Sequence, residues 1–287
     1  MAVNWRHYML IYVLIALSIL LAVLGCLLGG AFCSLTWLWL LPLEFIGSFV
    51  ILAALIFLAV WLLAKVVRTD IPQEQDSPFY RWLIGMIADA AHVLLGMRVH
   101  ATGLENTPKN GRLLLVCNHL HEFDPVVLLH HFRKSQLTFI SKRENANMFI
   151  VGKVMHKIQC QLINRENDRE ALKTILKCIQ ILKEDKASVM VFPEGYIHKE
   201  RKFQHFRSGV FKIAQKAQVP IVVCTITNTH KVLGNFRRLK PTDIDLHLLT
   251  VIEPEEYKGV TTVELADRIY NIMAQDLGPE YVPEENT

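Results

Sequence analysis

The N-terminal part of the chain is too apolar to be the core of a water-soluble domain. No residue from Tyr8 to Leu43 is charged, and one acidic residue later a second uncharged stretch runs from Phe45 to Ala64. A membrane-crossing helix needs about 20 apolar residues, so the first run is too long for one span. Gly29-Gly30 and Pro42 are expected to break it. We therefore predict a membrane hairpin of two helices, Met9 to Ala31 and Phe45 to Ala64.

The basic residues around this hairpin predict its sidedness. Arg6 precedes the first helix, Lys65 and Arg68 follow the second, and the connecting segment has no lysine or arginine. Because basic flanks stay on the cytoplasmic side, both ends and the chain after them are expected there. A shallow hairpin that does not cross the membrane predicts the same sidedness. A cleaved signal peptide is the other alternative, but its apolar region is shorter, about 7–15 residues.

The rest of the chain has the pattern of an α/β domain. We divide it into the hairpin (1–68), a polar linker (69–78) and a cytoplasmic domain (79–287), in which short apolar runs alternate with helical patterns. This alternation is typical of a mixed, largely parallel sheet flanked by helices. The expected helices are 79–97, one after 124, 168–184, 208–217 and 262–275, and the expected strands are 98–102, 113–117, 137–140, 158–163, 188–192, 221–227 and 244–251.

Cysteine spacing and charge exclude several classes of protein. The six cysteines stand apart in apolar runs without a C-x-x-C pair, so we expect buried thiols rather than disulfides. The net charge is +4, and the scattered basic clusters fit a solvated surface or contact with anionic lipid headgroups. No G-x-G-x-x-G follows a strand and there is no P-loop, which disfavours nucleotide-binding enzymes. No nucleic-acid partner is expected.

A histidine and an aspartate stand five residues apart directly after the apolar run Leu113 to Cys117. His119 and Asp124, with Asn118 beside them, would lie where this strand ends. Ligands of open α/β sheets bind at the carboxyl ends of strands, and a histidine paired with a carboxylate can deprotonate a hydroxyl there. The pair is therefore a candidate general base with its partner.

Two other interpretations of these residues stay open at this point. Asp124 is followed by proline and four apolar residues, so it could serve only as the N-cap of a helix. His119 and His121 could instead join His130-His131 in a metal site. Metal ligands usually need a further partner at a defined spacing, and none is convincing here, so we expect no metal.

Two further strands end in unusual polar residues. Arg165 follows strand 158–163, and Glu194 and Gly195 follow strand 188–192. A guanidinium can grip phosphate oxygens in two places, a glutamate can accept hydrogen bonds from a hydroxyl, and glycine lets a backbone approach closely. Taken alone, Arg165 could instead form a surface ion pair, and Pro193-Glu194-Gly195 could be an ordinary turn.

Four segments follow one another along the chain: Asn118-His119-(four residues)-Asp124, the strand that ends at Arg165, Phe192-Pro193-Glu194-Gly195, and Val219-Pro220-Ile221-Val222. Together they resemble the four sequence blocks of the glycerolipid acyltransferases, specifically the 1-acylglycerol-3-phosphate acyltransferases. The resemblance runs from about Gly85 to Ile226. Between the blocks, Ser141 to Glu144 and Phe206 to Gly209 resemble the lysine-bearing and F-x-x-G segments of that family.

The resemblance implies an acyl transfer without a covalent acyl-enzyme. His119 would act as general base on a free glycerol hydroxyl, which attacks the thioester of acyl-CoA or acyl-acyl-carrier protein, and Asp124 would orient the imidazole. The implied enzyme is a membrane-bound 1-acylglycerol-3-phosphate O-acyltransferase that makes phosphatidic acid in phospholipid synthesis. Its partners would be membrane phospholipid and the acyl donor, with no other cofactor.

The resemblance also implies the residues that bind the acceptor. Arg165 would hold its phosphate with help from Lys142, and Glu194 and Gly195 would hold its glycerol part. Asn118, next to the base, is counted with these substrate-binding residues.

The chain departs from the family pattern in three places. Gln159 replaces the glycine that usually stands six residues before the arginine, Tyr196-Ile197-His198 replaces Thr-Arg-Ser after the F-P-E-G block, and Val223 replaces a second proline. Acceptor recognition is therefore open, and the alternatives are another lysophospholipid or a lyso-amino lipid. A non-catalytic lipid-binding scaffold and a thioesterase that uses the same pair on water are the other hypotheses.

Overall fold

The computed structural model describes residues 9–71, 73–164 and 167–283 of the 287-residue chain. The chain divides into two compact units, Met1–Ile71 and Pro72–Thr287, and the division falls within the predicted linker. Each unit is described by itself.

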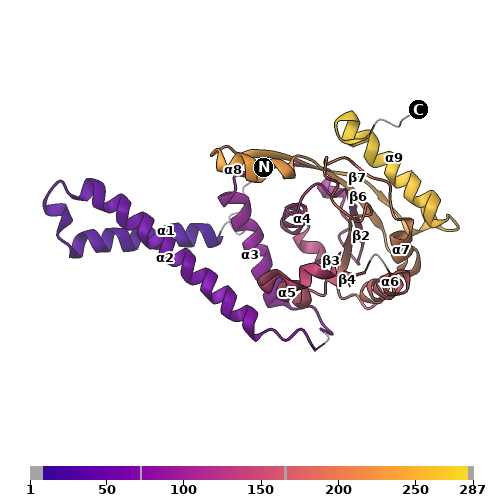
Figure 1. Ribbon diagram of the computed structural model, residues 1–287, viewed down its shortest axis with the longest axis horizontal. Helices are drawn as coiled ribbons and strands as arrows, with labels where there is room; N and C mark the ends of the chain where they lie inside the picture. Colours follow the sequence, from indigo (N-terminus) through magenta and orange to yellow (C-terminus); the bar gives the residue numbers. More distant parts are fainter. Residues whose placement is uncertain (1–8, 72, 165–166, 284–287) are drawn as a thin grey trace. The chain divides into compact units, whose positions relative to one another are not determined.

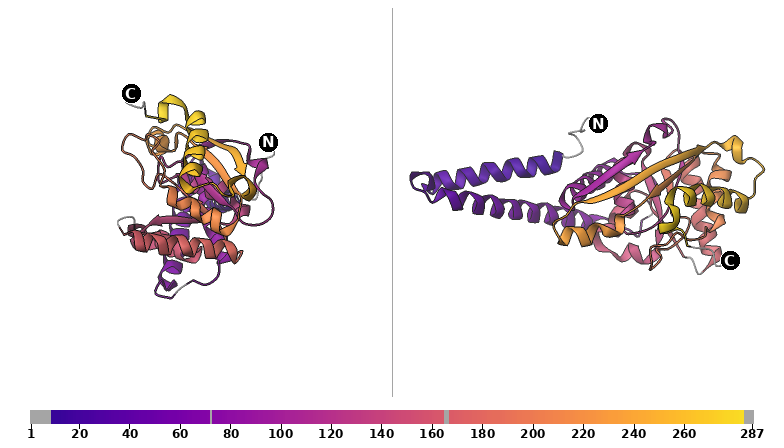
Figure 2. Two further views of the ribbon diagram at one scale, coloured as in Figure 1. Left: turned by 90° about the vertical axis from the view of Figure 1, so that its right-hand side faces the viewer. Right: turned by 90° about the horizontal axis from the view of Figure 1, so that it is seen from above.

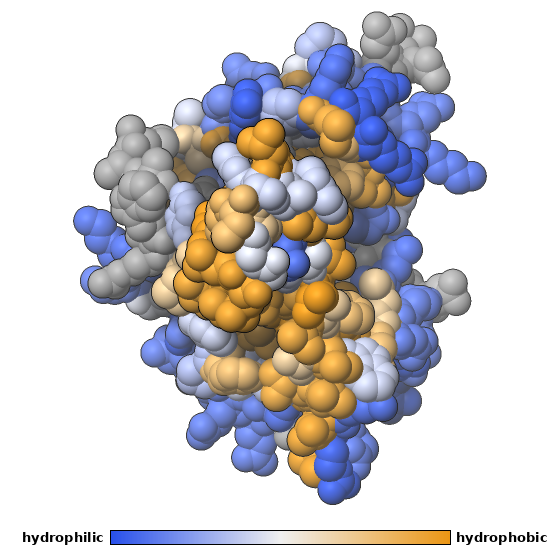
Figure 3. All heavy atoms as spheres, turned by 90° about the vertical axis from the view of Figure 1, so that its left-hand side faces the viewer, coloured by the Kyte–Doolittle hydropathy of each residue, from blue (hydrophilic) through white to orange (hydrophobic). Residues whose placement is uncertain are grey.

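The first unit is a pair of helices, α1 (Met9–Leu28) and α2 (Trp37–Val66), joined by a turn in which Gly30 has a φ of +67° (Figure 1). Both helices are long and apolar enough to cross a membrane. Ser48 of α2 donates a hydrogen bond from its hydroxyl to the carbonyl of Ser18 on α1, at 3.1 Å. Much of the exposed surface of this hairpin is apolar (Figure 3), a composition that would suit helices surrounded by lipid.

The prediction that Pro42 lies in the break between the two helices is wrong. Pro42 lies inside α2, which therefore begins at Trp37 rather than at Phe45. A proline near the start of a long helix removes one backbone hydrogen bond, whereas an unwound segment in an apolar hairpin would leave several groups without partners. Cys33, in the turn between the helices, is exposed rather than buried as expected.

The second unit contains one seven-stranded sheet, in the order β1-β7-β6-β2-β5-β3-β4. All neighbouring strands are parallel except β6 and β7, which are antiparallel. This confirms the predicted mixed, largely parallel sheet. The strands are β1 (Met97–Thr102), β2 (Leu114–Cys117), β3 (Leu137–Lys142), β4 (Gln161–Ile163), β5 (Ser188–Val191), β6 (Ile221–Ile226) and β7 (Thr242–Ile252).

Helices cover both faces of this sheet (Figures 1 and 2). Alternate residues of a strand point to opposite faces, and β2 follows this rule because Leu114 and Val116 pack with α6, α7 and α9, while Leu115 and Cys117 pack with α3 and α4. All four are fully buried. The helices are α3 (Pro78–Leu94), α4 (Asp124–His131), α5 (Phe149–Lys157), α6 (Asp168–Lys183), α7 (Lys212–Ala217), α8 (Val232–Arg237) and α9 (Thr262–Tyr281).

The predicted strand at 158–163 is shorter than expected, because its first half completes α5. The amide of Cys160 donates to the carbonyl of Met155, and Gln159 adopts a φ of +61°, which extended strands do not allow. β4 therefore begins at Gln161. Gln159 is the residue that replaces the family's glycine, and its backbone takes the left-handed conformation that glycine adopts most easily. Its buried side chain donates to the carbonyl of Gln73 in the segment before α3.

Candidate active site

The central strand β2 delivers Asn118 and His119 to the carboxyl edge of the sheet. The buried side chain of Asn118 extends the pairing of β2 with β6, because its amide nitrogen donates to the carbonyl of Ile226 and its oxygen accepts from the Ile226 amide, both at 2.8 Å. The next residue is thereby held where the strand ends. Substrate contact by Asn118 stays a prediction, since both polar atoms bind backbone.

His119 and Asp124 form a direct pair. The Nδ1 of His119 lies 2.8 Å from Oδ2 of Asp124, and a carboxylate can only accept there, so Nδ1 carries the proton and Nε2 has the free lone pair. The His119 side chain is 17% exposed, whereas Asp124 is fully buried. This is the arrangement of a general base whose tautomer is fixed by its partner.

Asp124 is held by more than the histidine. Its Oδ2 also accepts from the amides of Leu120 (2.7 Å) and His121 (2.9 Å), and its Oδ1 accepts from the hydroxyl of Thr229. Four donors thus hold this buried carboxylate in one position. Thr229 follows β6, more than a hundred residues along the chain, and was not predicted from the sequence.

The cap-only interpretation of Asp124 is wrong. Asp124 is the first residue of α4 and Pro125 follows in its first turn, but the carboxylate caps no amide of that helix. It bonds instead to the loop that precedes the helix, where His119 stands. The helix start and the imidazole are thus fixed by one side chain.

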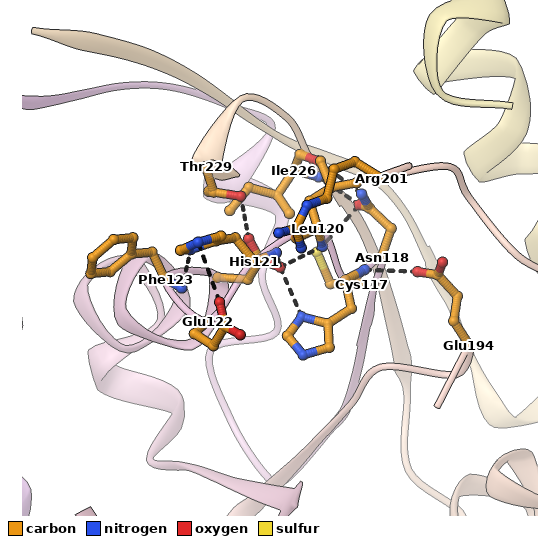
Figure 4. A network of polar contacts seen from close by, with 12 residues as sticks. Cys117, Asn118, Leu120, His121, Glu122, Phe123, Glu194, Arg201, Ile226 and Thr229 are labelled. Carbon is orange, nitrogen blue, oxygen red and sulfur yellow. Dashed lines mark hydrogen bonds and ion pairs between the residues drawn. The ribbon is translucent and has the colours of Figure 1, made fainter. Parts of the chain in front are cut away.

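Glu194 supports the same loop from β5. Its Oε1 accepts from the amide of His119 at 2.7 Å, and its Oε2 accepts from the amide of Gln204 at 3.0 Å. Figure 4 shows Glu194, Thr229 and Arg201 reaching the loop from three separate segments, and Arg201 donates to the carbonyl of Leu120 at 2.7 Å. The Glu194 side chain is buried, which raises its pKa to about 8. Its contact with an acceptor stays a prediction.

Phe192 and Gly195 shape the site beside the histidine. The ring of Phe192 stacks on that of His119, with centroids 3.9 Å apart and planes 10° from parallel. Gly195 has a φ of +83°, and a Cβ there would lie 3.0 Å from Nε of Arg207. Only glycine fits this turn without strain. Arg207 therefore sits directly against the F-P-E-G turn, although the sequence motif gave it no role.

The predicted phosphate-binding residues come from the next two strands. Lys142 ends β3 with an exposed side chain, and it is paired in register with Ile163 of β4. Arg165, two residues further, lies outside the described residues. β4 is three strands from β2 in the sheet, so at the usual strand spacing the carboxyl ends of these two strands lie about 14 Å apart. His119, Glu194 and Lys142 thus come from parallel strands whose carboxyl ends share one edge.

The metal site considered from the sequence is not formed by the residues proposed for it. His119 and His121 precede α4, whereas His130 and His131 lie in its last turn. An eight-residue helix is about 12 Å long, which separates the two pairs.

The sequence is similar to known proteins. A family model described as Acyltransferase matches residues 98–227, which include all the site residues described above except Thr229. A probable 1-acyl-sn-glycerol-3-phosphate acyltransferase of Mycoplasma pneumoniae is 30% identical over 192 residues, covering 63% of this chain and 71% of the relative. The 1-acyl-sn-glycerol-3-phosphate acyltransferase of Escherichia coli is 26% identical over 185 residues, covering 64% of this chain and 74% of the relative.

The fold is also similar to a solved structure. The crystal structure of the 1-acyl-sn-glycerophosphate acyltransferase PlsC from Thermotoga maritima superimposes with a TM-score of 0.59 at 21% sequence identity, covering 69% of this chain and 78% of that one. This likeness shows the α/β fold. The chain belongs to the acyltransferase family, among relatives named as 1-acyl-sn-glycerol-3-phosphate acyltransferases.

Proposed function

We propose that the protein is a membrane-bound 1-acylglycerol-3-phosphate O-acyltransferase. It transfers a fatty acyl group from a thioester, acyl-CoA or acyl-acyl-carrier protein, to the free hydroxyl of 1-acylglycerol 3-phosphate and so makes phosphatidic acid. The observation that carries the proposal is the His119–Asp124 pair at 2.8 Å, because a binding protein has no need of an oriented base. The names of the sequence relatives support the choice of acceptor.

His119 carries out the proton transfers in this mechanism. Its Nε2 takes the proton of the acceptor hydroxyl as the oxygen attacks the thioester carbonyl, and the C–S bond then breaks. The departing thiolate receives the same proton, so the products are an ester and a thiol. Asp124 stabilises the imidazolium between these steps. No acyl group is attached to the protein at any stage.

The acceptor phosphate is assigned to Lys142 and Arg165, at the ends of β3 and β4. Lys142 has an exposed ammonium at the required edge of the sheet. Glu194 and Gly195 are assigned to the glycerol part, with Glu194 acting through the backbone of His119. The changed segment Tyr196 to His198 lies beside this part of the site, so the competing proposal is transfer to a different lysophospholipid.

A lipid-product assay tests the proposal. Purified full-length protein in detergent is given palmitoyl-CoA or palmitoyl-acyl-carrier protein with one of four acceptors: 1-acylglycerol 3-phosphate, lysophosphatidylethanolamine, lysophosphatidylcholine or a lyso-amino lipid with a free hydroxyl. General base catalysis contributes about 10²–10⁴ in rate, so His119→Ala should lose most turnover. His100→Ala is the matched control, because His100 also pairs with an aspartate, Asp243, but on the exposed edge strand β1.

Each result decides between the candidates. Phosphatidic acid formed by wild type and His100→Ala but not by His119→Ala supports the proposal. If product forms only with another acceptor, that lipid is the acceptor in place of 1-acylglycerol 3-phosphate. Free fatty acid without any esterified product would identify a thioesterase. Equal product from wild type and His119→Ala would show that His119 is not the general base. No product with any pair of substrates would favour a lipid-binding scaffold.

We also propose that the hairpin anchors the enzyme and that the catalytic domain faces the cytoplasm. Lys65 in the last turn of α2 and Arg68 just after the helix support this orientation, as does the uncharged turn between the helices.

A further inference from the structure

Three histidines gather on the α3–α4 side of the sheet, away from the candidate active site. They are His92 of α3 and the neighbouring His130 and His131 of α4, and one ring nitrogen from each lies within 4.8 Å of the others. The rings are in contact: those of His92 and His130 stack with centroids 4.2 Å apart, and that of His131 meets both edge-on. Within the part of the chain that the structure describes, this is the one group of potential metal ligands.

His92 presents a lone pair to this cluster. Its Nδ1 lies 2.7 Å from the carbonyl of Ala88, which can only accept, so Nδ1 carries the proton and Nε2 does not. That Nε2 has no hydrogen-bond partner in the structure, and the side chain is only 4% exposed. A buried acceptor without a donor is costly, and a bound cation would satisfy it.

His130 is oriented in the same way by a carboxylate. Its Nδ1 lies 2.6 Å from Oδ1 of Asp89, a residue that is 2% exposed and also pairs with Arg133. Metal-bound histidines usually donate their second nitrogen to a carbonyl or a carboxylate, which fixes the tautomer and the ring direction. Ala88 and Asp89 give both kinds of support in one turn of α3.

We propose that His92, His130 and His131 bind one divalent transition-metal ion, of which Zn²⁺ is the representative, and that this ion ties α3 to α4. Three imidazoles suit zinc and its neighbours, whereas Mg²⁺ and Ca²⁺ need oxygen ligands. Zn–N bonds of about 2.0–2.1 Å require the rings to turn inward slightly on binding. Water takes the fourth position. The site is structural, because α4 separates it from the hydroxyl that His119 deprotonates.

Direct binding measurements test the proposal. The full-length protein, purified in detergent without a histidine tag, is stripped with a chelator, dialysed against micromolar Zn²⁺ and analysed for bound metal. We expect one equivalent per chain and a higher thermal unfolding midpoint with Zn²⁺ than with Mg²⁺. Co²⁺ in place of Zn²⁺ should give the intense visible absorption of tetrahedral coordination.

Two variants locate the ion. His131→Gln removes the most exposed of the three ligands, so it is the least damaging to the fold, and it should weaken Zn²⁺ binding at least 10-fold and abolish the stabilisation. His100→Gln, on the exposed edge strand β1, should bind Zn²⁺ like wild type. Wild-type protein that takes up no Zn²⁺, or equal uptake and stabilisation in wild type and His131→Gln, would overturn the proposal. Metal binding and acyl transfer are measured in separate experiments, so a failure of the metal proposal would leave the proposed acyltransferase activity unaffected.

Discussion

Asp124 is the side chain on which the candidate site depends most, because it holds His119, the proposed base, and the loop around it at once. The two loop amides and the Thr229 hydroxyl share the carboxylate with His119. A side chain that only oriented the imidazole would need one of these contacts. Asp124 therefore couples the direction of the base to the backbone on both sides of the site.

Asp124→Asn should lower kcat by about 10²–10⁴, because the amide can present its NH₂ to Nδ1 and leave His119 in the wrong tautomer. The KM for the acceptor should change much less. Steady-state kinetics of the purified variant measure both. Asp243→Asn, which alters an exposed histidine–aspartate pair, is the control and should keep wild-type kcat. A wild-type kcat in Asp124→Asn would contradict the assigned role.

Glu194 should make the stability of the fold depend on pH. Burial raises its pKa from 4.5 to about 8 in the folded state, so between these values the folded protein keeps a proton that the unfolded chain releases. The free energy of unfolding should therefore fall as pH rises from 4.5 to 8, by at most about 1.4 kcal/mol per pH unit.

Glu194→Gln tests this dependence, since glutamine does not titrate. Thermal unfolding midpoints measured from pH 4.5 to 8 should decline less steeply in Glu194→Gln than in wild type. Glu144→Gln changes an exposed glutamate and should keep the wild-type slope. Parallel curves for wild type and Glu194→Gln would show that the carboxylate is ionised throughout.

At the scale of elements, the turn after β5 combines an unusual backbone with a close neighbour. Gly195→Ala should destabilise the protein and reduce its activity, because a Cβ at a φ of +83° would also meet Arg207. Gly111→Ala is a matched control: its φ is +75°, but nothing lies within 4 Å of the new Cβ. It should cost only the strain of the left-handed conformation, about 1–2 kcal/mol, and keep full activity. If Gly195→Ala and Gly111→Ala lost the same unfolding midpoint and the same activity, the close contact with Arg207 would contribute nothing to the effect at Gly195.

Local patterns predicted the elements that carry the site, and tertiary contacts decided the rest. The apolar run before Asn118 and the proline after Asp124 were enough to predict β2 and α4. By contrast, the glutamine at 159 does not itself indicate a left-handed backbone, because glutamine rarely adopts that conformation, and so β4 was predicted too long. Thr229 could not be predicted at all, since only the adjacency of β6 and β2 brings it to Asp124.

At the scale of the whole molecule, a hairpin that crosses the bilayer should place its turn on the side opposite the catalytic domain. The chain contains its own reporter, because Cys33 in the turn is exposed, Cys160 is partly exposed and the other four cysteines are buried. A membrane-impermeant maleimide should label Cys33 in sealed vesicles only from the side opposite the catalytic domain. Cys33→Ser measures the background from Cys160. Labelling of Cys33 from the catalytic-domain side would instead support a shallow hairpin.

The flat stack of Phe192 on His119 has a kinetic consequence. A ring clamped by a parallel neighbour and a bond to Asp124 cannot exchange its two nitrogens during turnover, so a single nitrogen must collect the proton and deliver it. In the proposed mechanism that nitrogen acts directly on the acceptor hydroxyl and no side chain takes the acyl group, so both substrates have to be present together on that side of the ring. We expect sequential kinetics, in which double-reciprocal plots against one substrate at several levels of the other intersect. Parallel lines would mean that the acyl group waits on the enzyme.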